Sequence, residues 1–556
     1  MQQGSLRGPA NRMETKTDRA PITGQAARLG RHGLCLALLA LAACSGGPAG
    51  GPGESSSAPN SLTALAGDGE VTLSWHSVAG ASSYTVYWAA APGVTVASGH
   101  EVTGARSPTT HSGLTNGQTY SYLVTATVNG TESPGSSVAQ STPQVGASPY
   151  LPTWSNVAPA ETLTFEHDGG LTDTQNGAAL KAAITGLTPG QRLEIGTGTY
   201  SINSLTSINL IGTPSAPIWI AAKPAETPII TRPDAGQNAL NVGSSGPARY
   251  LALQGLEITG GSAGVRLYDC QQVWIDRCHI HHTGDAGLTA NTRDTANLHI
   301  TRNEIDHTAG TGEGMYLGAN NSVYVMRDSV IAQNHVHDCG GSQGDGIEIK
   351  QGSFGNWIVD NLVHDTNYPC ILLYGTDGNA FNTVERNVCY NSNDNVIQVQ
   401  GEALVRNNLI MNGGVGFGSH DHQGNVRDLT FVHNTVINSG RAVNLSDWSG
   451  RSGMTFANNA VYSQNSQSVR FANGSTGVEF VGNVVFGAVI GPASGFVLGA
   501  GLSDFANITW NATARDATPD ASAALIAAGD IIWEVSNDLS GATRVLPLDS
   551  GCLDRP

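Results

Sequence analysis

A single lysine stands close to a carboxylate in the middle of the chain. Lys350 is one of only four lysines among 556 residues, and Glu348 lies two positions before it. Residues two positions apart in a β-strand point to the same side, so the two charges would share one face. A neutral lysine in such a place can remove a proton from a substrate. The same two residues can also form a simple solvated ion pair, and their spacing fits both interpretations.

Two further acidic residues, Glu313 and Asp345, each stand immediately before a glycine. Both occupy the same place in successive copies of a repeat, so their carboxylates would be stacked. Stacked like charges repel, which raises their pKa or draws a shared cation between them. With Glu348 they supply the oxygen ligands that Ca²⁺ prefers. An acidic residue before glycine can alternatively serve only to form a turn.

The repeat that positions these residues consists of an apolar residue followed three positions later by asparagine. It recurs at intervals of 20 to 31 residues, with its asparagine at Asn303, Asn334, Asn361, Asn387, Asn407, Asn434, Asn459 and Asn483. A period of about 25 residues with only short strand-like segments predicts a solenoid, because the 3.6-residue period of helices is missing. One asparagine per turn predicts a ladder of stacked side-chain amides. We therefore predict an all-β chain folded as a parallel β-helix.

The second short strand of each turn can be aligned from one turn to the next. Apolar pairs such as Met315/Leu317 and Ile347/Ile349 fill the inward positions, so their neighbours must point outward. Adjacent strands lie roughly 4.8 Å apart, and we expect the outward side chains to form one strip. Its members are Tyr316, Glu348, Lys350, Tyr374, Gln398, Gln400 and His420. Aromatic, charged and amide groups in this arrangement suit a sugar chain that lies across the coils.

Residues 150–556 resemble the right-handed, pectin-lyase-like group of parallel β-helix proteins. Residues 344–353 (GDGIEIKQGS) resemble the region where alginate lyases and chondroitinase-B-type polysaccharide lyases carry acidic calcium ligands and a lysine base. The resemblance implies a β-elimination at a uronate in an acidic polysaccharide, with Glu348 as a Ca²⁺ ligand and Lys350 as the base. The chain departs from that family in two places. A second glutamate is replaced by Gly346 or Lys350, and an arginine on a following coil by Leu372 or Tyr374.

The predicted site has three groups of residues. Glu313, Asp345 and Glu348 hold Ca²⁺. Lys350 is the base, and Tyr374 or His420 protonates the leaving oxygen. Tyr316, Gln398 and Gln400 contact the substrate.

The N-terminus is typical of an exported protein. Residues 1–32 contain six basic residues, and a short apolar stretch follows at residues 34–43. This order predicts a secretory signal peptide over residues 1–43. Leu41-Ala-Ala-Cys44 resembles a bacterial lipobox, which implies lipidation of Cys44 and anchoring to the cell envelope, at the outer membrane or cell surface. The alternative is an ordinary signal with a chance cysteine. Residues 44–58 have the Gly/Ser/Pro composition of a tether.

Residues 59–143 alternate like a β-sandwich. Leu114 and the run to Tyr120 resemble the tyrosine corner of a fibronectin type III domain, so we predict such a domain ahead of the β-helix at residues 150–556. Residues 176–186 are expected to form a short helix that caps the first coil.

Six cysteines remain after Cys44, namely Cys270, Cys278, Cys339, Cys370, Cys389 and Cys552. Export permits disulfides, but the sequence does not fix their pairing.

The composition limits the possible partners. The formal net charge is −17, whereas a general nucleic-acid binder needs a basic surface.

A polygalacturonase-type hydrolase would need paired aspartates, and Ser419-His-Asp-His422 is the nearest approach to its motifs. Mannuronan epimerases share proton abstraction with lyases, but their Asp-Pro-His motif is missing. A non-catalytic surface glycan-binding or adhesion protein remains the alternative to a lyase.

Overall fold

The computed structural model describes residues 58–555, apart from residues 60–61, 76–77, 79–80, 106, 108 and 145–147. The predicted signal peptide, Cys44 and almost all of the predicted tether lie outside the described residues. None of the helices in the described part of the chain is long and apolar enough to span a membrane.

The first described strands form two antiparallel sheets. One has the order β1-β2-β5, and the other has the order β4-β3-β6-β7 with β8 paired to β6. The Tyr120 hydroxyl accepts a hydrogen bond of 3.0 Å from the Thr115 backbone amide. The assignment of this segment to the fibronectin type III class stays a prediction. The strands are β1 (Thr63–Ala66), β2 (Val71–Ser74), β3 (Ala81–Ala89), β4 (His100–Ala105), β5 (Thr109–His111), β6 (Tyr120–Val128), β7 (Thr131–Glu132) and β8 (Ala139–Ser141).

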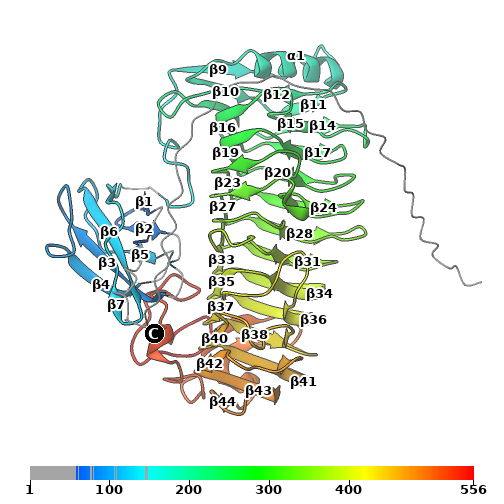
Figure 1. The fold of residues 1–556 in the computed structure, drawn as a ribbon. Coiled ribbons are helices and arrows are strands. Elements are labelled where there is room, and N and C mark those ends of the chain that lie inside the picture. The colour runs from blue at the N-terminus through cyan, green and yellow to red at the C-terminus, as the bar shows by residue number, and fades with distance from the viewer. Residues whose placement is uncertain are drawn as a thin grey trace, which may run out of the picture. The chain divides into compact units, whose positions relative to one another are not determined.

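The rest of the chain winds into a right-handed parallel β-helix (Figure 1). Each coil contributes one strand to a first column, and two coils contribute a second, short one; every strand pairs in parallel with counterparts in adjacent coils. This column contains β9 (Glu161–Phe165), β10 (Gln191–Ile195), β13 (Ile218–Ala222), β16 (Ala248–Gln254), β19 (Cys270–Asp276), β22 (Thr295–Ala296), β23 (His299–Thr301), β26 (Met326–Arg327), β27 (Val330–Ala332), β30 (Trp357–Val359), β33 (Asn382–Glu385), β35 (Ala403–Arg406), β37 (Leu429–Val432), β40 (Thr455–Ala457) and β42 (Glu479–Val481).

The remaining parallel strands form a second and a third column, which merge where a strand runs through both. The second column holds β11 (Gly198–Ser201), β14 (Pro228–Arg232), β17 (Glu257–Gly260), β20 (His279–His281), β24 (Glu304–Thr308), β28 (His335–Cys339), β31 (Leu362–Thr366) and β38 (Thr435–Asn438). The third holds β12 (Ser207–Ile208), β15 (Leu240–Val242), β18 (Val265–Leu267), β21 (Leu288–Ala290), β25 (Met315–Leu317), β29 (Ile347–Ile349), β32 (Ile371–Tyr374) and β39 (Val443–Leu445). The strands β34 (Val388–Gln400), β36 (Leu409–Ser419) and β41 (Ala460–Phe471) pass through both columns, and β43 (Asn483–Ile490) and β44 (Phe496–Leu498) end the stack.

The interior of the stack is filled by the alternate apolar residues of these strands. Met315, Leu317, Ile347 and Ile349 are fully buried in one continuous core, as their predicted inward orientation requires. Helix α1 (Asp173–Thr185) covers the N-terminal end of the core with Leu180 and Ile184 (Figure 1). It begins three residues earlier than predicted, because Thr172 and Gln175 form a capping box there.

The predicted asparagine ladder is present and buried. The Asn361 carbonyl oxygen accepts from the Asn334 side-chain amide at 2.9 Å, and the Asn361 amide donates to Asn387 at 2.9 Å. One predicted member was wrong. Asn408, not Asn407, continues the ladder by accepting from Asn387 and donating to Asn434. Asn407 instead has a positive φ of 56° and accepts from Arg544, since the two adjacent asparagines shift the repeat by one residue.

The chain ends against the outside of the last coils. The short elements are η1 (Asn320–Ser322), η2 (Leu502–Asp504), η3 (Ile531–Trp533) and the antiparallel pair β45 (Phe505–Ile508) and β46 (Arg515–Pro519). The Arg544 guanidinium is buried and donates to the carbonyl oxygen of Gly551. All six described cysteines are buried free thiols.

Candidate active site on the third column of strands

The predicted strip lies on the third column. Tyr316 is opposite Glu348, Glu348 is opposite Leu372, and Leu372 is opposite Gln398. Tyr374 is opposite Gln400 in the neighbouring position. The alternation of inward and outward residues was therefore predicted in the correct register. Its physical basis is the two-residue period of the strand, which the buried apolar pairs fix.

Lys350 is held at the centre of this strip. Its Nζ donates to Glu348 Oε1 at 2.6 Å. The same nitrogen lies 4.8 Å from the centre of the Tyr316 ring and 4.6 Å from that of Tyr374. Only 4% of the lysine is exposed. The ion pair considered from the sequence exists, but it is not solvated, because the two aromatic rings enclose the ammonium group.

Three carboxylates converge beside this lysine. Glu313, Asp345 and Glu348 are each 1% exposed, and one oxygen from each lies within 4.8 Å of the others. Glu313 and Asp345 occupy equivalent places, since the amide of Gly314 donates to the carbonyl oxygen of Asp345. Among the described residues, neither Asp345 Oδ1 nor Glu348 Oε2 has a hydrogen-bond partner. Two buried acceptor atoms are therefore available to a cation.

The electrostatics of the cluster follow from burial and like charge. Burial, reinforced by the charges of Glu348 and Glu313, raises the pKa of Asp345 well above its usual range. Burial also raises the pKa of Glu348, although Lys350 opposes that shift. The three carboxylates thus carry more negative charge than one lysine balances. Protonation of Asp345 or binding of a cation would relieve the excess.

The aromatic residues of the strip are held in their neutral form. Burial, followed by the charge of Glu348, raises the pKa of both Tyr316 and Tyr374. Burial and the neighbouring His422 lower the pKa of His420. The Gln400 side-chain nitrogen lies 3.4 Å from His420 Nε2. Both phenols are therefore protonated at neutral pH, while His420 is mainly a neutral imidazole.

The strip is more enclosed than the sequence suggested. Gln400 is fully buried and Gln398 is 9% exposed, although both were predicted as surface contacts for a substrate. The loop after β36 folds over this part of the column. The Gly375 amide donates to the Gln423 carbonyl oxygen, and the ring of His422 lies 5.9 Å from that of Tyr374. This loop covers the column because of tertiary packing, which residue alternation cannot reveal.

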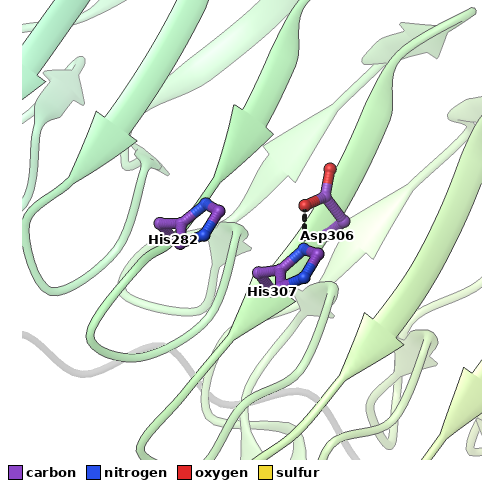
Figure 2. A group of neighbouring side chains, drawn as sticks. All are labelled: His282, Asp306 and His307. Atoms are coloured by element: carbon purple, nitrogen blue, oxygen red, sulfur yellow. Dashed lines mark hydrogen bonds and ion pairs between the residues drawn. The ribbon is translucent and has the colours of Figure 1, made fainter.

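Sequence reasoning missed a set of histidines on the second column. They are His279, His281, His282, His307, His335, His337 and His364, which we call the histidine face. Figure 2 shows part of it, where the rings of His282 and His307 stack at 4.7 Å and His307 contacts the Asp306 carboxylate. The His-x-His sequences at 279–281 and 335–337 were the available signal.

A comparison with protein-family models agrees with this architecture. A family model described as "Right handed beta helix region" matches residues 234–382. A search of curated proteins finds no match. Among solved structures, pectate lyase Pel9A is 17% identical, with 72% of this chain and 98% of that chain covered and a TM-score of 0.44. An alginate lyase from Paenibacillus sp. str. FPU-7 is 16% identical, with coverage of 60% and 99% and a TM-score of 0.37.

One further solved structure matches a smaller part of the chain. A Fn3-like protein from Clostridium thermocellum is 27% identical, covers 16% of this chain and 92% of its own, and has a TM-score of 0.15. These scores carry no argument about activity. The fold itself rests on the strand columns and on the match of the central coils to the family model. The chain is a right-handed parallel β-helix protein.

Proposed function

We propose that this protein is exported, anchored to the cell envelope through a lipid on Cys44, and cleaves an acidic polysaccharide by β-elimination at a uronate. The observation that carries the proposal is the convergence of Glu313, Asp345 and Glu348 beside Lys350. A buried cluster of acids next to a lysine, in which the pKa of Asp345 is raised well above its usual range, is typical of a functional site. Structural ion pairs rarely leave two buried carboxylate oxygens without a partner.

The carboxylate cluster fits Ca²⁺. Calcium takes oxygen ligands from aspartate and glutamate, and the partnerless Asp345 Oδ1 and Glu348 Oε2 supply two such atoms beside Glu313. When bound, Ca²⁺ would neutralise the uronate carboxylate and make the C5 proton more acidic.

The residues of the strip would carry the proton transfers. Lys350 must first release to water the proton that it donates to Glu348, because only a neutral amine can accept another. It then takes the C5 proton, the electron pair of that bond forms the C4–C5 double bond, and the C4–O4 bond breaks. The O4 oxygen takes a proton from Tyr374, whose raised pKa keeps the phenol protonated. For a sugar to reach Lys350, the rings of Tyr316 and Tyr374 that enclose the ammonium group must move apart.

A second candidate is a non-catalytic, surface-exposed glycan-binding or adhesion protein. The observation that favours it is the 4% exposure of Lys350 together with its direct pairing to Glu348. In that case the lysine only neutralises the acid cluster. The polar outer side chains of the coils would then form the recognition surface.

Digestion of a panel of uronate polysaccharides separates the two candidates. Alginate, pectate, chondroitin and glucuronan would be incubated with the purified protein, either with Ca²⁺ or with a chelator. β-Elimination creates a double bond that absorbs ultraviolet light, so the lyase proposal expects an absorbance rise that requires Ca²⁺. No rise on any polymer, with binding to one of them retained, would favour the glycan-binding candidate.

A further inference from the structure

The histidine face contains a cluster that the proposed function does not use. Glu304 on β24 is opposite His335 on β28, and Asp306 is opposite His337, which is opposite His364 on β31. In the first two of these coils, both outward positions are occupied by imidazoles or carboxylates, whereas the third carries Leu362 opposite His335 and His364 opposite His337. These strands belong to the second column, whereas Lys350 and its carboxylates belong to the third.

Neighbouring aspartates determine which nitrogen of two imidazoles carries the proton. His337 Nδ1 lies 2.8 Å from the Asp338 carboxylate, and His364 Nδ1 lies 2.7 Å from that of Asp365. Ionised carboxylates only accept hydrogen bonds, so Nδ1 is the donor in both rings. The Nε2 atoms of both histidines, when neutral, therefore carry lone pairs.

The contact with His364 determines which ring nitrogen of His335 carries the proton. Their Nε2 atoms are 2.9 Å apart, and because the His364 nitrogen carries a lone pair, the His335 nitrogen must be the donor. The Nδ1 atom of His335 then carries the free lone pair. This atom lies 3.8 Å from Glu304 Oε1, and His337 Nε2 lies 3.3 Å from the same oxygen.

Three electron-pair donors thus face one another: His335 Nδ1, His337 Nε2 and Glu304 Oε1. Without a metal, a protonated His337 shares its Nε2 proton with Glu304 Oε1 in a hydrogen bond of 3.3 Å, and a metal cation would take the place of that proton. The cluster is accessible, because the Glu304 side chain is 49% exposed and the His335 side chain is 39% exposed. Figure 2 shows the adjoining part of the same face, where His282 of the preceding coil lies beside Asp306 and His307 of β24.

We propose that Glu304, His335 and His337 bind one divalent transition metal of the zinc type. Two imidazoles and one carboxylate suit Zn²⁺ better than Ca²⁺, which takes oxygen ligands. Asp338 and the Asp365–His364 pair hold the two imidazoles in the ligating tautomers, as outer hydrogen bonds do in many metal sites. The metal links two successive coils and leaves a position open to solvent.

Calorimetric titration of the chelator-stripped protein with ZnCl₂ tests the site. We expect one Zn²⁺ to bind, with Ca²⁺ unable to compete. His335→Gln/His337→Gln should abolish binding, and Glu304→Gln, at a half-exposed position, should weaken it without endangering the fold. Asp365→Asn removes only the outer hydrogen bond, so we expect affinity to fall by about tenfold or more.

The variant His282→Gln/His307→Gln provides the matched control, because it removes two histidines of the same face that are not proposed ligands, one just after β20 and one on β24. It should bind Zn²⁺ like the unaltered protein. Visible absorption of bound Co²⁺ gives an independent readout of nitrogen coordination. Unchanged binding in His335→Gln/His337→Gln and Glu304→Gln, or loss confined to the control, would overturn the proposal, as would the failure of Zn²⁺ to bind at all. None of these outcomes depends on lyase activity.

Discussion

Lys350 Nζ lies 2.6 Å from Glu348 Oε1, and both side chains are almost completely withdrawn from solvent. The ammonium group also lies between the rings of Tyr316 and Tyr374. This pair connects the carboxylate cluster to the aromatic strip. Whether it is a catalytic pair or only a structural one decides what the third column does.

Removal of the lysine should destabilise the fold. Lys350→Ala leaves Glu348 buried beside two other acids without its counter-ion, and breaking a buried pair in this way costs about 3–5 kcal/mol. Urea denaturation would measure the change in the free energy of unfolding. Glu348→Gln/Lys350→Ala is the matched control, because it removes both charges and should be less destabilised than Lys350→Ala. Equal losses in the two variants would show that the pair is energetically unimportant.

The acid cluster should make stability fall as pH rises. The pKa of Asp345 is raised by folding, so the folded state binds its proton more tightly than the unfolded state. The resulting stabilisation is complete below the usual aspartate pKa of about 3.9 and is lost as the pH rises through the higher folded value. Asp345→Asn cannot ionise and should lose this dependence.

The measurement is the free energy of unfolding of both proteins across that pH range, in the presence of a chelator. The gap between them should widen with pH in favour of Asp345→Asn. Addition of Ca²⁺ should then stabilise the unaltered protein at neutral pH and have less effect on the variant. A constant gap would mean that Asp345 ionises normally in the fold.

The asparagine ladder should be a main support of the coils. Asn361 is buried and exchanges side-chain hydrogen bonds with Asn334 and Asn387. Asn361→Ala leaves buried partners unsatisfied, each at about 1–3 kcal/mol. We expect a loss of about 2–4 kcal/mol in the free energy of unfolding. Asn393→Ala, at an exposed asparagine, should change stability by less than about 0.5 kcal/mol; similar effects of the two would exclude a special role for the ladder.

Periodicity made most of the fold predictable. The asparagine repeat and the alternation around Met315 and Ile347 are local signals, and they placed the ladder and the outward strip in the correct register. The prediction failed at Asn407, where Asn408 follows directly and two registers fit the same motif. Local sequence could not choose between them, because the choice depends on which side chain meets Asn387 and Asn434.

The sequence could not predict that the site is buried. The alternation of residues along a strand shows that the side chains of Lys350 and Gln400 point away from the core. It does not show which other segment packs over them. The loop at residues 420–427 is distant in sequence from Tyr374, and only tertiary packing brings them together. The histidine face was missed because Glu304, which lies opposite His335, belongs to another coil, and the His-x-His sequence at 335–337 does not by itself show that neighbour.

The most direct test of the account is Ca²⁺-dependent formation of the ultraviolet-absorbing product by Lys350→Arg. Arginine can keep the ion pair with Glu348 but stays protonated at ordinary pH, so it preserves the charge and removes the base. The account predicts a folded protein of near-normal stability that still binds the polysaccharide and produces no unsaturated uronate. Activity in Lys350→Arg equal to that of the unaltered protein would contradict the assignment of Lys350 as the base.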